Sequence, residues 1–88
     1  MNLRYSQKFV LSLRKLAAAD KTTVILAVEL FQENHIHPSL RNHALKGKMS
    51  GKRAIVVDQD LRIIFTERGN YQDVTLPDVG SHAEVYRH

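Results

Sequence analysis

The chain has 88 residues, of which 43% are hydrophobic and 25% are charged. These values are typical of one small folded domain and exclude a chain that is disordered as a whole. The formal net charge of +4 favours an acidic partner, such as nucleic acid, an acidic protein or an anionic surface. The absence of cysteine excludes disulfides and thiolate metal sites. The sequence has no secretory signal and no apolar run of membrane-spanning length, so we expect a cytoplasmic protein.

The first part of the chain predicts a short strand followed by two helices. The strand covers residues 2–5, and Ser6 is a suitable N-cap for the first helix. Apolar residues then recur at helical spacing, at Phe9, Leu13 and Leu16. Asp20 is expected to cap the second helix, whose apolar face consists of Val24, Ala27, Val28, Leu30 and Phe31. The β-branched run at 22–25 would also suit a strand, but the apolar pattern continues without a breaker until His37 and Pro38, which favours a helix.

The rest of the chain predicts short strands separated by turns. The expected strands are Arg53–Val57, Leu61–Thr66 and Tyr71–Leu76, with turns at 58–60 and 68–70. Pro77 is expected to end the last strand. Ser81 and Glu84 have the spacing of a capping box, which predicts a final helical turn.

Two helices followed by a meander of strands predict an α+β fold. We expect a single domain over residues 1–88. Its two N-terminal helices would pack on one face of a twisted antiparallel sheet of three to four strands. The other face of the sheet would then be available for function.

A basic segment separates the helices from the strands. No Asp or Glu occurs between Glu33 and Asp58, so nothing local neutralises its positive charge. A concentrated positive field on a short segment with two glycines suits contact with the phosphates of a nucleic acid. The alternative is a solvated charged loop. The cationic residues are Arg41, Lys46, Lys48, Lys52 and Arg53.

Strand alternation assigns the side chains of residues 60–66 to two faces. Leu61, Ile63 and Phe65 are expected to face the helices, whereas Asp60, Arg62 and Ile64 point to the other side. Asp60 and Arg62 are either a surface ion pair or a functional pair. In the functional pair the arginine binds phosphate and the carboxylate orients it or moves a proton.

Histidines supply further candidates. His82 would be the first residue of the final helical turn, beside unpaired amides that attract anions, and a histidine suits acid–base work near neutral pH. The alternative is a polar surface residue near a helix cap. His35 and His37 alternate before a proline, but no third ligand follows at a recognisable spacing. We therefore expect no metal site and no other cofactor.

Three segments together resemble the RelE/ParE toxin superfamily, and within it the YafQ-like branch of toxin–antitoxin modules. They are His43–Arg53 with a His-x-Leu-x-Gly pattern, Asp60–Phe65 with an opening Asp-Leu-Arg, and Asp78–Tyr86 with a Gly-Ser-His sequence. The resemblance implies two helices packed on an antiparallel sheet. It also implies an endoribonuclease that cleaves mRNA on the ribosome and is restrained by the acidic, disordered segment of a cognate antitoxin. Oligomers would form only through the antitoxin.

The resemblance also implies roles for individual residues. His82 matches the family's catalytic histidine and would protonate the leaving oxygen. Asp60 or His43 would accept the proton of the 2′-hydroxyl group. Arg62 and Arg53 would stabilise negative charge. RNA contacts would come from Arg41, Lys46, Lys48, Lys52, Arg53 and Tyr86.

The resemblance is incomplete on the expected active face. Ala54 and Val56 stand where relatives have an aspartate and a histidine, and Met49 stands where a tryptophan is common. Two other functions therefore stay open. One is a ParE-like toxin that inhibits DNA gyrase without cutting nucleic acid. The other is an inactive relative that binds RNA or an antitoxin.

Overall fold

The computed structural model describes residues 1–86. Its elements in chain order are β1 (Asn2–Tyr5), α1 (Gln7–Arg14), α2 (Ala18–Glu33), the 3-10 turn η1 (Pro38–Leu40), β2 (His43–Ala44), a second 3-10 turn η2 (Gly47–Met49), β3 (Arg53–Val56), β4 (Leu61–Arg68), β5 (Asp73–Ser81) and α3 (His82–Val85). No helix in this part of the chain is long and apolar enough to span a membrane.

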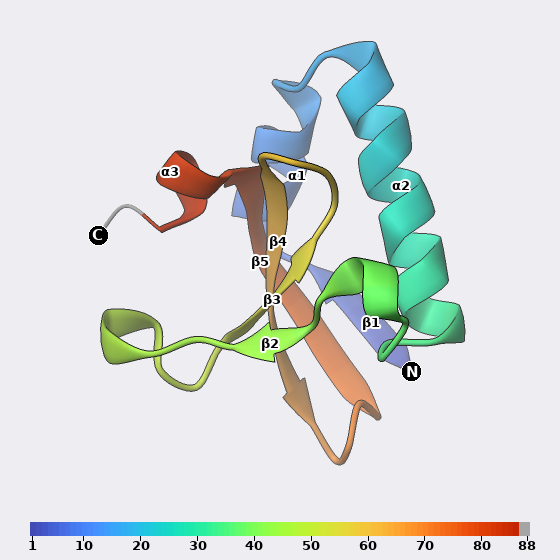
Figure 1. Ribbon diagram of the computed structural model, residues 1–88, viewed down its shortest axis with the longest axis vertical. Helices are drawn as coiled ribbons and strands as arrows, with labels where there is room; N and C mark the ends of the chain where they lie inside the picture. The colour runs from blue at the N-terminus through green and yellow to red at the C-terminus, as the bar shows by residue number, and fades with distance from the viewer. Residues whose placement is uncertain (87–88) are drawn as a thin grey trace.

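The strands form one sheet in the order β1-β5-β4-β3-β2. Helices α1 and α2 lie on one side of it (Figure 1), so the predicted α+β fold with two helices on one face is confirmed. The sheet has more strands than expected and is mixed, because β1 pairs with β5 in parallel. The two-residue strand β2 was not predicted; it adds an edge next to β3.

The starts of the two helices differ in how they are capped. Ser6 caps α1 as predicted, because its Oγ accepts a hydrogen bond of 2.9 Å from the Phe9 N–H. The prediction that Asp20 caps α2 is wrong. Ala17 is the N-cap and provides no side-chain hydrogen bond, while Asp20 lies in the first turn. A negative charge there still interacts favourably with the helix dipole.

Strand β5 continues past Pro77, which corrects the prediction that the strand ends there. The pairing of β4 with β5 changes register between Ile64 and Thr66. This bulge takes Pro77 out of the ladder, so its missing N–H costs no hydrogen bond. The Pro77 carbonyl accepts a 2.7 Å hydrogen bond from Ser6 Oγ, which fixes the bulge to the start of α1. Because two residues of β5, Leu76 and Pro77, lie opposite Phe65 of β4, residues 78–81 then pair with the beginning of β4.

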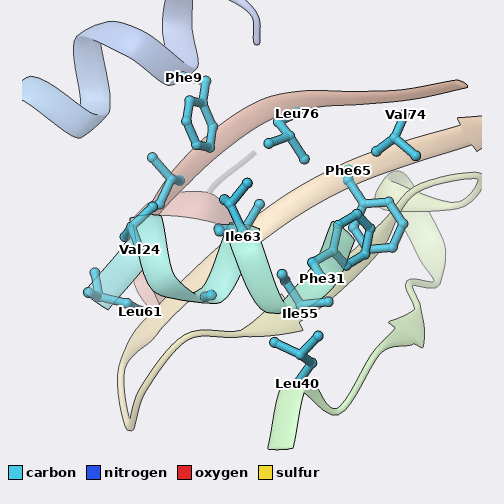
Figure 2. Packing of buried hydrophobic residues seen from close by; sticks show 13 residues of the cluster. Phe9, Val24, Phe31, Leu40, Ile55, Leu61, Ile63, Phe65, Val74 and Leu76 are labelled. Carbon is cyan, nitrogen blue, oxygen red and sulfur yellow. The ribbon is translucent and has the colours of Figure 1, made fainter. Parts of the chain in front are cut away.

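The main core lies between the helices and the sheet (Figure 2). Leu61, Ile63 and Phe65 all belong to it, which confirms the predicted alternation along β4. Phe31 of α2 meets Phe65 edge-on, with ring centroids 4.8 Å apart. Burying side chains of this size contributes about 1.5–3 kcal/mol each, so this layer holds α2 on the sheet.

The opposite face of the sheet carries a second, smaller core. Met49 of η2 and Val85 of α3 cover Ala54 and Ile64, and all four are buried. Figure 1 shows α3 and the loop with η2 on the side of the sheet away from α1 and α2. The prediction that this whole face is free is therefore wrong. Only the part beyond the small core is left for polar groups.

Candidate active site

The polar part of this face begins at Arg62. In the sheet register Arg62 lies between Val56 of β3 and Gly80 of β5. Its Nη1 donates to the carbonyl oxygens of Asp58 at 2.9 Å and of Leu61 at 3.0 Å. These bonds hold the guanidinium against the β3–β4 turn. Within residues 1–86, Nε and Nη2 make no hydrogen bond and can bind an anion.

Asp60 is bonded to the start of α3 and not to Arg62. The His82 N–H donates to the Asp60 carbonyl oxygen at 2.9 Å and to Asp60 Oδ1 at 3.3 Å. Over residues 1–86, Asp60 and Arg62 do not form the surface ion pair that was one of the two alternatives. Asp60 is thus placed to hold the backbone of His82.

The short helix α3 is fixed by a complete capping box, as predicted. Ser81 Oγ accepts from the Glu84 N–H at 3.2 Å, and Glu84 Oε1 accepts from the Ser81 N–H at 2.9 Å. Gly80 leaves room for this arrangement, because a Cβ there would stand 3.1 Å from Glu84 Oε1. Together with buried Val85, the box sets the position of His82 on the first turn.

His82 and Tyr86 lie on the same side of α3. Their ring centroids are 4.5 Å apart and their planes meet at 68°, so Tyr86 supports an exposed imidazole. Burial raises the pKa of Tyr86 above 10.0, and the charge of Arg62 opposes this effect. The Tyr86 hydroxyl therefore stays protonated at neutral pH and is able to donate a hydrogen bond. One group of side chains therefore lies where β4 begins and β5 ends. It consists of His82, Tyr86, Arg62 and Asp60.

His43 approaches the same face from the edge strand. It pairs with Ala54, so its side chain shares the face that carries Arg62. Its Nδ1 lies 2.7 Å from the Arg41 carbonyl oxygen. A carbonyl only accepts, so Nδ1 carries a hydrogen, and in the neutral imidazole Nε2 is then the nitrogen with the lone pair. Arg41 has a φ of 46°, a left-handed conformation that turns the chain at this point.

The basic segment is largely unpaired. Arg41, Lys46 and Lys48 are exposed and Lys52 is partly so. The only ion pair among the described residues joins Lys8 and Asp78, so the segment keeps its positive field.

Arg53 lies on the other face of the sheet. It pairs with Phe65 and so faces the α2 side, where its Nε donates to Asn42 Oδ1 at 2.9 Å. Arg62 points the opposite way. The expectation that Arg53 and Arg62 stabilise one charge is wrong, because strand alternation separates them.

Two further histidines, His35 and His37, have structural contacts. His35 stacks on Tyr71 with ring centroids 3.7 Å apart. His37 caps η1, since its Nδ1 accepts from the Ser39 N–H at 3.1 Å. No three His, Asp or Glu side chains in the described chain gather into a group suited to a metal ion.

One polar residue of this face was missed from the sequence. Asp78 faces the same side as Ile64, with which it pairs, and its side chain is only 14% exposed. The sequence predicted that the last strand ends at Pro77. Asp78 was therefore not included in the strand alternation, and the sequence did not predict which face of the sheet it occupies.

Comparison with solved structures identifies the class of fold. The chain is similar to YafQ from E. coli strain BL21(DE3), with a TM-score of 0.81, 17% identity and 97% of each chain covered. It is similar to the toxin–antitoxin complex DinJ–YafQ from E. coli, with a TM-score of 0.78, 18% identity and 97% of this chain and 96% of that chain covered. A YoeB/ParE toxin from Agrobacterium tumefaciens gives a TM-score of 0.75 at 14% identity, with 93% of this chain and 99% of that chain covered. At these identities the likeness shows the fold.

The sequence decides the family. Residues 1–87 match the family described as the bacterial toxin of type II toxin–antitoxin system, YafQ. The chain therefore belongs to the YafQ toxin family, which confirms the resemblance read from its three segments. A comparison with curated proteins found no significant match.

Proposed function

We propose that this toxin is a metal-independent endoribonuclease that cleaves mRNA on the ribosome. The observation that carries the proposal is the group formed by His82, Tyr86, Arg62 and Asp60 at one end of the sheet. An imidazole, a protonated phenol and a partly unbonded guanidinium lie together there, on the face that also receives His43.

The chemistry uses the 2′-hydroxyl of the RNA as the nucleophile. Its oxygen attacks the adjacent phosphorus, the bond from phosphorus to the 5′-oxygen breaks, and a 2′,3′-cyclic phosphate forms. The reaction needs a base for the hydroxyl proton, an acid for the leaving oxygen and a cation for the charge on phosphorus. His82 donates the proton to the leaving oxygen, and Arg62 stabilises the charge.

His43 is the base in this mechanism. Its Nε2 has a free lone pair because Nδ1 donates to the Arg41 carbonyl. Asp60 acts as a positioning residue, since its carbonyl oxygen and its Oδ1 both accept from the His82 N–H. Arg41, Lys46, Lys48 and Lys52 bind the RNA backbone from the edge of the sheet.

A cognate antitoxin restrains this activity in the cytoplasm, where mRNA is translated. The E. coli relative crystallised as a complex of DinJ with YafQ, and the net charge of +4 suits an acidic partner segment that folds on binding.

The alternative of a toxin that does not cut RNA rested on Ala54 and Val56. Ala54 is buried beneath Met49 and Val85, so an apolar side chain there is explained by packing. Val56 lies beside Arg62 in the sheet and leaves that arginine in place. Neither residue favours gyrase inhibition over cleavage.

His82→Ala tests the proposal. A single acid–base group contributes about 10²–10⁴-fold to the rate, so we expect cleavage of reporter mRNA and growth arrest to be lost while the circular dichroism spectrum is unchanged. The matched control is His37→Asn, which removes an imidazole but keeps a good N-cap acceptor, and it should cleave like the parent. Undiminished cleavage by His82→Ala would contradict the assignment. A parent that arrests growth while leaving transcripts intact would contradict the ribonuclease itself.

A further inference from the structure

A hollow of about 210 Å³ lies beside the proposed active site. Its apolar lining comes from Pro77 and from three largely buried members of the small core, Met49, Ile64 and Val85. Its polar lining comes from Lys8, Lys52 and Asp78. This combination suits a nucleotide. Apolar side chains suit a flat ring, the carboxylate suits a hydrogen-bond donor at the edge of the ring, and the two lysines suit negatively charged phosphates on either side.

Asp78 is held firmly by one of its oxygens. Oδ1 accepts from the Ser12 hydroxyl at 3.2 Å and from the Val79 N–H at 2.9 Å, which occupies both of its lone pairs. Oδ2 is 3.3 Å from Lys8 Nζ, and the Lys8 side chain is 68% exposed. Oδ2 thus retains room for a further donor, and its partner is a solvated lysine.

The hollow lies close to the scissile phosphate in the proposed mechanism. Asp78 pairs with Ile64, and Gly80 pairs with Arg62. These two rows are two residues apart along β4, or roughly 7 Å. A base bound in the hollow would belong to a nucleotide next to the cleaved bond.

We propose that this hollow binds a nucleobase of the RNA and that Asp78 selects bases with an exocyclic amino group. The inference rests on the proposed function. The ring lies against the apolar rim of the hollow at Met49 and Pro77, Oδ2 accepts from the amino group, and Lys8 and Lys52 contact the flanking phosphates. Uracil is disfavoured because its only ring donor lies between two carbonyl oxygens, which a carboxylate repels. Cytosine presents an amino group in place of one of those carbonyls.

Binding of short RNAs tests the inference without cleavage. The protein is the His82→Ala variant, and the ligands are fluorescent uridine hexamers with or without a single cytidine at each position in turn. Contacts of this kind discriminate between bases by roughly 5–100-fold. We expect a preference of that order for cytidine at one position, because cytosine and uracil have the same ring size.

Asp78→Asn is the decisive change. The Val79 N–H and Ser12 keep the amide oxygen at the place of Oδ1, so the amide nitrogen takes the place of Oδ2 and donates. The cytidine preference should disappear or reverse towards uridine. Ser12→Ala is the control, because it removes one bond to Oδ1 and leaves Oδ2 unchanged; it should keep the preference.

Two results would overturn the inference: equal binding of all hexamers by His82→Ala, or an unchanged preference in Asp78→Asn. Failure of the proposed function is separate, since it is measured as cleavage by the parent. A parent that cleaves RNA but shows no cytidine preference contradicts only the role of Asp78. A protein that selects cytidine but does not cleave contradicts only the ribonuclease.

Discussion

At the scale of single residues, the bonds to the His82 N–H separate two candidates for the base. Asp60 offers its carbonyl oxygen and Oδ1 to that one group, so its geometry serves the position of α3. His43 has a ring nitrogen directed away from its own backbone bond. Asp60 and His43 are both exposed, so exposure does not show which of them is the base. Their hydrogen bonds favour His43.

Conservative substitutions test this division of roles. Asp60→Asn keeps an acceptor for the His82 N–H and should lower kcat less than about tenfold, whereas loss of a general base in His43→Gln should cost about 10²–10⁴-fold. Single-turnover cleavage of a short RNA measures both. The pH profile of Asp60→Asn should keep the shape of the parent profile. A larger loss in Asp60→Asn than in His43→Gln would reverse the roles.

At the scale of elements, two of the proposed site residues depend on α3, a helix of four residues that begins at His82 and is followed by Tyr86 as its C-cap. A helix this short is not stable alone. It depends on the Ser81 cap, on Val85 in the small core and on the bonds to Asp60. The precision of the site therefore depends on contacts outside the helix.

Ser81→Ala removes the cap and tests that dependence. Loss of an N-cap costs about 0.5–2 kcal/mol of unfolding free energy, which urea denaturation measures. We also expect slower cleavage, because His82 is no longer held at one position. Ser81→Asp restores a cap acceptor and should recover most of both properties. Full activity in Ser81→Ala would show that the cap does not position His82.

Most helices and strands could be predicted from the sequence, because the spacing of apolar residues shows which side of an element is buried. Helical spacing from Phe9 onward and alternation along 61–65 both reflect which side faces the main core. The bulge at Pro77 and the small core were not predictable. The bulge depends on pairing with β4, and the small core depends on Met49 and Val85, which meet only in the folded chain. For the same reason, the sequence identified Asp60 and Arg62 as candidates but did not predict their hydrogen-bond partners. It also grouped Arg53 with Arg62, although the two side chains lie on opposite faces of the sheet.

At the scale of the whole molecule, positive charge is concentrated at one edge of the sheet. The basic segment enters the sheet through β2 and β3, and within residues 1–86 its lysines have no acidic partner. In the proposed function, an RNA strand that crosses the face from this edge would reach His43 first and then the end that carries Arg62. The two proposals therefore divide the work: charge along the edge would provide affinity for RNA, and the hollow beside Asp78 would provide selectivity between bases.

Salt titration tests the contribution of the edge. For single strands, each phosphate contact contributes about 0.7 to the slope of log K against log salt. Lys46→Gln, Lys48→Gln and Lys52→Gln should each lower the slope by about that amount. Lys21→Gln on α2 is the control and should leave the slope unchanged. Fluorescence anisotropy with a labelled RNA measures the slopes, and equal slopes in all four variants would place the RNA elsewhere.

The parallel pairing of β1 with β5 has a consequence for the time course of folding. Asn2 Nδ2 donates to Asp73 Oδ1 at 3.1 Å across a separation of 71 residues, so β1 is incorporated late although it precedes the other strands of the sheet in the chain. The hairpins of β3, β4 and β5 are local and form quickly, whereas β1 and α1 must wait for β5. Until then the apolar faces of the two helices lack a sheet to cover them. A growing chain can therefore pair β2, β3 and β4, but it lacks the complete sheet and the proposed site before β5 and α3 have been made.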